Sequence, residues 1–598
     1  TIVNLRSIRR ESFPLGAFTP LIGYNNAGKT NILMGIHWLL SRISLDISYF
    51  DDPSLPVEVI GTFSGLNENI ISRLNPERAS ILRRFVSNGS FRVRKVQRVP
   101  SESPESMRLF IQEANAFGEN GWHPMPSIFQ EAFERLFPEP IRILDFNSTK
   151  TNAHLLHEIF KPLERKLESD FAELQQKFRE ILSFDGDTRA KELQNFDRDV
   201  NSMLLPLFPN VRLKLEIPPP SLEIFLKSAA LMVIDEEDGF SRNISETGAG
   251  SQRAIQMALV RYLAELKKKT RTNYLSNRLL LIDSPELFLH PQAVELVRVS
   301  LKKLSQEGYQ VIFATHSAQM VTSEDVSTSL LIRKNKERGT FMRKRMEDAV
   351  RQVLRDAPSQ LQTLFSLSNS NELLFADYVL LTEGKTEWRV LPTLFERLTG
   401  KSFALIKCAL VRQGGVSNTK KSMRVLSAMD VPVRAIVDLD YAFTSAVHDG
   451  FLDKNDPDLE ACRKIFFKLS RFGKMRLVNG IPVNKRSRMS AAQGFALMAQ
   501  DPEAELPLRS IHLKLRKRGI WVWRYGAIEE HLGLEGKTEK IWSAFIDKIR
   551  YKEPRKFIPH YEDLEALCEW ILEGMPFAAK AAEISSLVSI ASRLSANA

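Results

Sequence analysis

The stretch Leu21-Ile-Gly-Tyr-Asn-Asn-Ala-Gly-Lys-Thr30 decides the fold of the amino-terminal half. An apolar strand leads into it, and residues 31–40 carry apolar side chains at the spacing of a helix. The pattern G-x-x-x-x-G-K-T between them is that of the phosphate-binding loop, whose backbone N–H groups surround phosphate oxygens. Lys29 would add positive charge, and the Thr30 hydroxyl would hold Mg2+. We therefore expect ATP and Mg2+ to be bound here by Asn26, Gly28, Lys29 and Thr30.

Two downstream segments supply the rest of a nucleotide site. The apolar strand Leu279-Leu-Leu-Ile-Asp283 ends in a carboxylate, which suits the Mg2+ shell through water. Before it, the loop Ser245-Glu-Thr-Gly-Ala-Gly-Ser-Gln-Arg253 leads into a helix. Small residues at the start of a helix leave its backbone N–H groups accessible to anions. The sequence therefore predicts further contacts to ATP from Gly248, Gly250, Ser251, Gln252 and Asp283.

Two histidine motifs complete this set. Leu289-His-Pro291 follows the carboxylate strand, and Ala314-Thr-His-Ser317 follows a second apolar strand at 311–313. In this order the motifs resemble those of ABC-type ATPases of the SMC and RecF kind. The resemblance implies that His316 senses the γ-phosphate, and that the loop at 245–253 binds the γ-phosphate held by a second protomer. A homodimer, or a higher homo-oligomer, assembled around ATP would follow.

One position departs from the ABC pattern. Those ATPases commonly place a glutamate that activates water directly after the strand-ending aspartate, whereas Ser284 stands there in this chain. A hydroxyl cannot act as a carboxylate base, so either Glu286 or His316 takes over this role, or ATP serves chiefly as a binding switch. Gln97 is a candidate metal-sensing glutamine.

A second set of carboxylates occupies the carboxy-terminal half. The strand Tyr378-Val-Leu-Leu-Thr382 delivers Glu383-Gly-Lys-Thr-Glu387, and a helix that begins between the two glutamates would let them converge. The strand Val433-Arg-Ala-Ile-Val437 delivers Asp438-Leu-Asp440, whose alternation would point both carboxylates to one side. Four hard oxygen ligands suit Mg2+ or Mn2+. We therefore expect a metal site made by Glu383, Glu387, Asp438 and Asp440.

A strand-ending Glu-Gly followed by a strand-ending Asp-x-Asp, with the turn Gly414-Gly415 between them, resembles the Toprim fold. Such a cluster implies two-metal cleavage of phosphodiesters, in which one ion activates water and the other shields the leaving oxygen. An ABC-type ATPase followed by Toprim is similar to the OLD (overcoming lysogenization defect) nucleases, especially their phage Old-like branch, and the Gabija defence nucleases are related. The resemblance covers the whole chain and implies Mg- or Mn-dependent cleavage of DNA, in phage exclusion or antiviral defence.

In that family a later glutamate and a distal lysine also serve the nuclease site. The segment Gly519-Ile-Trp-Val-Trp-Arg-Tyr-Gly-Ala-Ile-Glu529 resembles the one that carries the glutamate, which assigns Glu529. Lys537 is the nearest lysine downstream and is assigned to stabilise the pentavalent phosphate, with Lys552 and Lys556 as alternatives. Basic clusters at 485–488 and 514–518 are candidates to hold a sugar-phosphate backbone without reading bases.

The length of the chain predicts an α/β protein of several domains, because 598 residues exceed one hydrophobic core. Apolar residues at helical spacing over 155–182 predict a long amphipathic helix, which is either core or a projecting dimerisation arm. The expected division is an ABC-type (SMC/RecF-like) ATPase domain at 1–150 and 206–335, a helical insertion at 151–205, a connector at 336–375, and a Toprim domain with C-terminal helices at 376–598.

Composition bounds the partners and the compartment. Lys and Arg outnumber Asp and Glu by 83 to 72, and the net charge of +11 favours a polyanionic partner, DNA or RNA. The three cysteines form neither a CxxC pair nor a disulfide framework, so we expect a reducing cytoplasm and no zinc. No apolar run reaches ~18 residues, so neither a membrane span nor a secretion signal is expected.

Two other functions share part of these residues. An ATP-switched DNA clamp or repair scaffold would need the nucleotide motifs but not the second carboxylate cluster. A primase or topoisomerase would share the Toprim carboxylates, yet nothing in the sequence identifies the strand-attacking tyrosine that a topoisomerase needs. The sequence therefore predicts an ATP-binding, metal-dependent DNA nuclease, with a non-cleaving clamp as the alternative.

Overall fold

The computed structural model divides into two compact units, each of which is described by itself. Unit 1 comprises Thr1–Ile32, Asp46–Val57 and Thr315–Ala598, and unit 2 comprises Leu33–Leu45 and Glu58–Ala314. Among the helices of the described part, none is long and apolar enough to cross a membrane. The residues that the structure describes are 1–66, 68–72, 76–110, 121–125, 139–143, 156, 159–160, 167, 171–182, 188–206, 211–215, 217, 231–234, 239–269, 278–322, 324–326, 328–345, 348, 370–413, 418–471, 475–484 and 489–574.

In unit 1, five neighbouring strands support the phosphate-binding loop. Only β13 and β3 pair in parallel, whereas the other pairs among the five are antiparallel. All five residues of β3 are buried, and the chain leads from β3 through the loop into α1 (Lys29–Leu40), which confirms the predicted strand, loop and helix. Across the sheet the order is β1 (Ile2–Leu5), β2 (Ile8–Glu11), β14 (Gly339–Met342), β13 (Leu330–Asn335) and β3 (Phe18–Ile22).

The carboxy-terminal part of unit 1 contains a four-stranded sheet whose pairs are all parallel. Its strands are short runs of apolar residues, as expected for strands that are covered on both faces. Because they are parallel, their carboxyl ends meet at one edge of the sheet. The order is β16 (Cys408–Arg412), β15 (Tyr378–Thr382), β17 (Val433–Val437) and β20 (Ile520–Val522).

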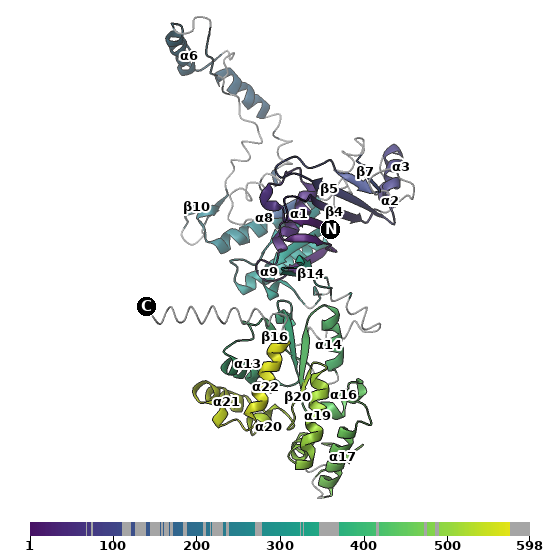
Figure 1. Ribbon diagram of the computed structural model, residues 1–598. Coiled ribbons are helices and arrows are strands. Elements are labelled where there is room, and N and C mark those ends of the chain that lie inside the picture. The colour runs from purple at the N-terminus through teal and green to yellow at the C-terminus, as the bar shows by residue number, and fades with distance from the viewer. Residues whose placement is uncertain are drawn as a thin grey trace. The chain divides into compact units, whose positions relative to one another are not determined.

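Helices lie on both sides of this sheet (Figure 1). One group is α13 (Lys385–Thr399), α20 (Ile528–Leu532), α21 (Glu539–Tyr551) and α22 (Tyr561–Glu573). The other is α14 (Thr419–Ala428), α16 (Ser445–His448), α17 (Pro457–Ser470) and α19 (Glu505–Arg516). A continuous core joins the sheet to the first group and includes Tyr378, Phe395, Trp523, Phe545 and Trp570.

Unit 2 combines two kinds of strand pairing. Its three parallel strands are β8 (Glu139–Ile143), β11 (Arg278–Asp283) and β12 (Tyr309–Thr315), with β11 in the centre. Its antiparallel part contains β5 (Ser90–Gln97), β6 (Arg108–Phe110) and β7 (Trp122–Pro124), next to β4 (Val57–Ser64). A small core that includes Phe85, Phe91, Val93 and Leu109 lies beneath the antiparallel strands. The longer helices are α8 (Ala249–Lys269) and α9 (Pro291–Gln306).

The amphipathic helix predicted over 155–182 lies partly outside the described residues. Its described positions, 156, 159, 160, 167 and 171–182, are all helical, and Leu156 and Ile159 are buried. On the stretch 171–182, Leu174, Phe178 and Ile181 are 50%, 40% and 45% exposed. These apolar side chains are therefore not core positions of the described part of unit 2. The dimerisation arm stays a prediction. The helix α6 (Lys191–Leu204) follows it in the chain.

Candidate metal centre and nucleotide-binding loops

The phosphate-binding loop and the predicted γ-phosphate sensor lie together in unit 1. Lys29 is buried, and its Nζ atom donates hydrogen bonds to the backbone carbonyls of Gly23 and Tyr24, at 2.8 and 3.1 Å. The same Nζ atom lies 3.1 Å from Nδ1 of His316, the exposed residue that follows β12. The structure thus places His316 beside the lysine of the loop, although the two are 287 residues apart in sequence.

The backbone of this loop requires glycine at positions 23 and 28. A Cβ atom on Gly23 would lie 2.5 Å from the carbonyl oxygen of Ile332. Gly28 has φ of 98°, and a Cβ atom there would collide with the side chain of Thr340. Asn26 also has a left-handed φ, of 66°, which asparagine tolerates better than most residues. Thr30 is exposed in the first turn of α1, and the Mg2+ role of its hydroxyl stays a prediction.

Unit 2 holds the other residues predicted to bind ATP. Gly248 precedes α8, and Gly250, Ser251 and Gln252 lie in its first turn, with Ser251 exposed. A Cβ atom on Gly250 would lie 2.9 Å from the carbonyl oxygen of Phe288, so a side chain there would collide with backbone. The small residues at this helix start therefore allow a close approach between α8 and the loop that follows β11.

Arg253 links α8 to the loop that follows β11 by hydrogen bonds, and this residue was assigned no role from the sequence. It is buried, and its guanidinium donates to the carbonyls of Pro285 at 3.0 Å and Asp283 at 3.3 Å, and to that of Ser284. Burial lowers the pKa of Arg253 to about 8, although the nearby carboxylates of Glu286 and Asp283 act in the opposite direction. Its only sequence signal was its position directly after Ser-Gln in the loop at 245–253.

Ser284 stands where ABC-type ATPases have their catalytic glutamate. Its φ is 48°, and its hydroxyl donates a hydrogen bond to Oδ1 of Asp283 at 3.2 Å. Glu286 is buried in the same loop, within the electrostatic range of Arg253. Gln97, the candidate metal-sensing glutamine, uses its side-chain amide to bind the backbone of Leu45 and Val99 and is fully buried. A structural role therefore accounts for Gln97.

The predicted carboxylates meet at the carboxyl edge of the parallel sheet in unit 1. Glu383 follows β15 and Asp438 follows β17, and the backbone N–H of Asp438 donates to Oε2 of Glu383 at 3.1 Å. α13 begins at Lys385, between the two glutamates, as expected, and Glu387 is buried in its first turn. Glu529 is buried at the start of α20, after β20. Residues from three segments of the chain thus share one edge.

The expected reason for the pairing of Asp438 with Asp440 is wrong. The chain does not continue as a strand after Val437, because Leu439 has helical backbone angles, φ −62° and ψ −33°, and Asp440 begins the short helix α15 (Asp440–Phe443). Alternation along a strand therefore does not orient the two carboxylates. A turn into a helix brings them to the same edge.

Burial and mutual repulsion make these carboxyl groups reluctant to ionise. The pKa values of Glu383 and Glu387 are raised to about 7, mainly by burial and then by neighbouring carboxylates. Burial raises the pKa of Asp438 well above its usual range, and Glu387 and Glu383 add to the effect. The pKa of Asp440 is also raised by burial. A divalent cation would relieve this repulsion only where carboxylate oxygens face it, so the orientation of the oxygens matters.

Two carboxylate oxygens of the cluster fit a cation. Oδ1 of Asp438 and Oδ1 of Asp440 are buried and have no hydrogen-bond partner within the described part of the chain. Buried polar atoms without partners are rare in folded proteins, and a bound ion can satisfy them. Among the described residues, no three His, Cys, Asp or Glu side chains already form a ligand cage. An all-oxygen donor set suits Mg2+ or Mn2+.

Lys537 lies at the same edge, as the resemblance assigned it. Its Nζ atom is 3.2 Å from Oε2 of Glu529. Burial by itself would lower the pKa of Lys537, but Glu529 and Asp438 outweigh it and the pKa is raised. The ammonium group therefore stays charged beside the carboxylates. Of the alternatives, Lys556 forms an ion pair with Glu553 at 2.8 Å.

Two further residues position the cluster and were not found from the sequence. The hydroxyl of Thr386, a buried residue, donates to Oε1 of Glu529, and Nε1 of the buried Trp523 donates to Oε1 of Glu387 at 3.2 Å. Such outer contacts orient the carboxylates that would bind metal. Gly384 has a comparable role, because a Cβ atom there would lie 2.6 Å from Oε2 of Glu387.

Other predicted residues do not reach the cluster or lie outside the described part. Gly414, Gly415 and the basic cluster at 485–488 are outside the described residues. In the cluster at 514–518, Lys514 is neutralised by Asp456 and Asp458, at 2.6 and 2.7 Å. That lysine is therefore a structural cation in the described chain.

The raised pKa values predict a pH-dependent stability in the absence of metal. For Glu383 and Glu387 the folded pKa, about 7, lies above the ordinary 4.5, so their stabilisation is fully present below pH 4.5 and is lost as the pH rises through about 7. A shift of this size corresponds to roughly 3 kcal/mol for one group. Because two groups are shifted, we expect the free energy of unfolding in chelator to fall by at least about 3 kcal/mol between pH 4.5 and 8, as measured by denaturant titration.

The matched variant for this test replaces both glutamates by glutamine. It should have a flatter pH profile than the parent protein, because neither side chain can ionise. Mn2+ added to the parent protein at pH 8 should recover much of the lost stability. A variant whose profile still follows that of the parent would show that other groups cause the pH dependence.

Comparisons with known proteins agree with the order of the two sites along the chain. Residues 18–321 match the family model described as "AAA domain, putative AbiEii toxin, Type IV TA system", and residues 374–440 match "Overcoming lysogenization defect protein-like, TOPRIM domain". The predicted architecture, an α/β ATPase domain followed by a Toprim domain, is therefore confirmed.

Two relatives match over most of their length. The chain is 31% identical over 585 residues to the Old nuclease of Escherichia phage P2, which covers 96% of this chain and 99% of the relative. It is 21% identical over 464 residues to the OLD nuclease of Thermus scotoductus (strain ATCC 700910 / SA-01), covering 73% and 81%. Among solved structures, an SMC head bound to the C-winged helix domain of ScpA is 13% identical with a TM-score of 0.34, covering 58% of this chain and 98% of that one.

Proposed function

Because the chain belongs to the overcoming lysogenization defect (OLD) family of nucleases, we propose that it is an ATP-binding nuclease that cleaves DNA with the help of Mg2+ or Mn2+. The observation that carries this proposal is the meeting of Glu383, Asp438 and Glu529 with Lys537 at one edge of the parallel sheet. A non-cleaving clamp would have no need of these buried, mutually repelling carboxylates. Their cost to stability is best explained by a function in cation binding.

The residues of this chain divide the work of the proposed reaction. Glu383, Glu387, Asp438 and Asp440 would hold the cations, which when bound supply positive charge to the scissile phosphate and lower the pKa of attacking water. Lys537 would stabilise the added negative charge of the pentavalent phosphate. Its ion pair with Glu529 holds it in place, and Thr386 fixes the orientation of Glu529 in turn. Trp523 does the same for Glu387.

The proposed role of ATP is chiefly that of a binding switch. The proposed ATP contacts come from both units. In unit 1 they are Asn26, Gly28, Lys29, Thr30 and His316, and in unit 2 they are Gly248, Gly250, Ser251, Gln252 and Asp283. Ser284 orients Asp283 through its hydrogen bond and cannot replace a carboxylate base, so slow hydrolysis follows. Glu286 remains the carboxylate of that loop best suited to the base role.

The proposal extends to partners and to biological role. The net charge of +11 supports a nucleic-acid partner, and DNA is preferred over RNA because of the family. We propose a homodimer, or a higher homo-oligomer, that assembles around ATP. The family name and the phage origin of the 31% identical relative support a role in phage exclusion or antiviral defence, within the cytoplasm.

The deciding experiment is a cleavage assay on supercoiled plasmid, linear DNA and RNA. We expect DNA products in Mg2+ or Mn2+ and none in chelator, with ATP and a non-hydrolysable analogue compared against no nucleotide. Binding of plasmid in all conditions, with no cleavage in any metal, would instead support the clamp. Cleavage that persists in chelator would exclude the two-metal mechanism.

A further inference from the structure

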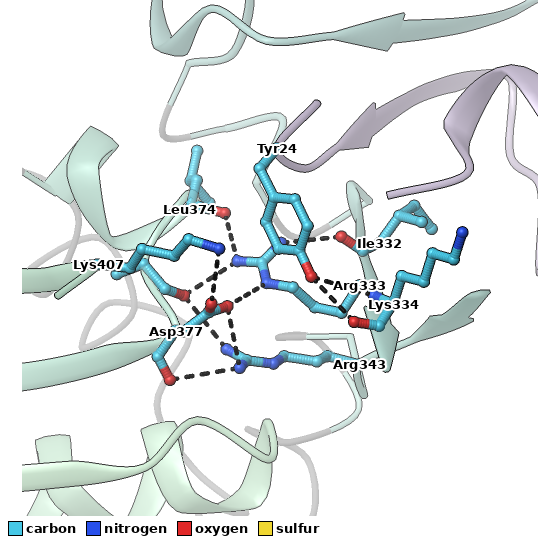
Figure 2. A network of polar contacts seen from close by, with 9 residues as sticks. Tyr24, Ile332, Arg333, Lys334, Arg343, Leu374, Asp377 and Lys407 are labelled. Atoms are coloured by element: carbon cyan, nitrogen blue, oxygen red, sulfur yellow. Dashed lines mark hydrogen bonds and ion pairs between the residues drawn. The ribbon is translucent and has the colours of Figure 1, made fainter. Parts of the chain in front are cut away.

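A buried polar cluster in unit 1 joins the phosphate-binding loop to β15, the strand of the four-stranded parallel sheet that comes first in the chain (Figure 2). Its centre is the carboxylate of Asp377, which lies directly before β15. Nε of Arg333 donates to Oδ1 of Asp377 at 3.1 Å, Nη2 of Arg343 is 3.8 Å from Oδ1, and Nζ of Lys407 is 3.6 Å from Oδ2. Together with Tyr24, these residues are called the Asp377 cluster below.

Tyr24 belongs to this cluster and to the phosphate-binding loop at the same time. Its ring lies 4.1 Å from Nζ of Lys407 and 5.7 Å from Cζ of Arg333, and its hydroxyl donates to the carbonyl of Lys334 at 3.1 Å. Its own backbone carbonyl accepts a hydrogen bond from Nζ of Lys29 at 3.1 Å. Figure 2 shows the ring beside the side chains of Lys407 and Arg333. One residue therefore contacts both the lysine of the loop and the cations around Asp377.

On the other side, the cluster holds the start of β15. Nη2 of Arg333 donates to the carbonyls of Leu374 and Ala376, both at 3.0 Å, and the N–H of Asp377 donates to the carbonyl of Lys407 at 2.9 Å. β15 begins at the next residue and ends one residue before Glu383. One buried strand thus connects Asp377 directly to a proposed metal ligand, Glu383.

The cluster is poorly able to deform gradually. Arg333, Arg343 and Asp377 are buried, and one carboxylate faces three cations, so every donor needs a partner. Burial lowers the pKa of Arg333, and it lowers the pKa of Arg343 to about 10, with Arg333 adding to the effect on Arg343. A buried network of this kind changes between discrete arrangements, because intermediate ones leave charges without partners.

We propose that the Asp377 cluster transmits the state of the phosphate-binding loop, through Tyr24 and β15, to the nuclease centre. When phosphates engage Lys29, its ammonium no longer needs the carbonyl of Tyr24, and the ring of Tyr24 is released to shift against Lys407 and Arg333. That shift alters how Asp377 is held and so where β15 presents Glu383. The inference deepens the proposed function, on which it rests, by naming the residues that regulate the nuclease site.

The test uses two mild variants, because removal of Asp377 or Arg333 would leave a buried charge without its partner. Lys407→Met removes a charge whose side chain is half exposed and keeps the apolar stem, and Tyr24→Phe removes only the hydroxyl. The matched control is Lys468→Met, because Lys468 is similarly exposed and pairs with Asp501 and Glu503 away from the cluster. All are studied as full chains.

The first readout is amide hydrogen exchange of peptides that cover 378–383, with and without a saturating non-hydrolysable ATP analogue. We expect the analogue to change exchange by about fivefold or more in the parent protein and in Lys468→Met, which is at the low end of allosteric coupling. In Lys407→Met the change should fall below about twofold, whereas Tyr24→Phe, which keeps the ring and the backbone carbonyl, should respond as the parent protein does. An equal response in parent and Lys407→Met would overturn the proposal, as would a parent protein that does not respond.

The second readout, the ratio of plasmid cleavage with and without the analogue, separates this proposal from the proposed function. If Lys407→Met still cleaves plasmid but its ratio falls to about one, both the coupling and the nuclease function are supported. Metal-dependent cleavage at one rate with and without analogue, together with unresponsive exchange, leaves the nuclease standing and removes the coupling. If the analogue changes exchange in the parent protein but not in Lys407→Met, and none of the proteins cleaves DNA, the coupling is supported and the nuclease function is excluded.

Discussion

Replacement of Asp438 with Asn is expected to reduce metal-dependent DNA cleavage by about 10³-fold or more, which corresponds to roughly 4 kcal/mol of transition-state stabilisation. Oδ1 of Asp438 is buried and has no hydrogen-bond partner among the described residues. Burial raises the pKa of the group well above its usual range, and Glu387 and Glu383 add to the effect. Asparagine keeps the shape but cannot supply the anionic oxygen. Since it also removes repulsion with Glu383 and Glu387, thermal stability in chelator should not fall.

The matched control for this variant is Asp430→Asn. Asp430 is exposed at the turn before β17 and has a φ of 58°, which asparagine tolerates. The Asp430→Asn variant should cleave DNA and bind Mn2+ as the parent protein does. Cleavage rates, Mn2+ binding by calorimetry and melting temperature should be measured on both variants. Parent-like cleavage by a folded Asp438→Asn protein would exclude Asp438 from the mechanism.

Replacement of Lys29 with Met should weaken binding of ATP by about 10²-fold, or roughly 2.7 kcal/mol. The lysine is buried, and its ammonium lies between the carbonyls of its loop and His316, so charge rather than packing is what the substitution removes. Methionine fills a similar volume. A fluorescent ATP analogue measures the affinity directly.

Lys336→Met is the control for this second variant, because Lys336 is exposed near the turn between β13 and β14 and lies in the same unit. Its affinity for the analogue should match that of the parent protein. If Lys29→Met also binds the analogue with the parent affinity, the loop at 23–30 is not a nucleotide site. Cleavage without nucleotide should persist in both variants, since neither changes a carboxylate of the nuclease centre.

The features of the fold and of the site that could be predicted from the sequence are those encoded by contiguous motifs. A phosphate-binding loop needs a strand, a glycine-rich turn and a helix in direct succession, and β3 and α1 follow this order around Gly28 and Lys29. Likewise, the carboxylates after β15 and β17 share an edge because parallel strands align their carboxyl ends. Short-range sequence patterns carry such information, since the interactions that specify them are local.

The residues that position the site could not be predicted in this way. Thr386 and Glu529 are 143 residues apart, Trp523 and Glu387 are 136 apart, and each is an ordinary residue in its own segment. The orientation of Asp438 and Asp440 was predicted from strand alternation, which was wrong because the backbone turns helical at Leu439. A local pattern cannot show where a chain leaves its strand when the next residues pack against distant helices.

By itself, the sequence determined the order of the two domains, the loop that surrounds phosphates, and the carboxylates at the strand ends, because each depends on neighbours in the chain. Only the tertiary structure decided which charges are buried together. Arg333, Arg343 and Lys407 look like surface cations in a basic sequence, yet they surround Asp377 beneath Tyr24. Whether a charge is solvated or paired depends on its burial, and burial is set by contacts between segments that lie far apart in the chain.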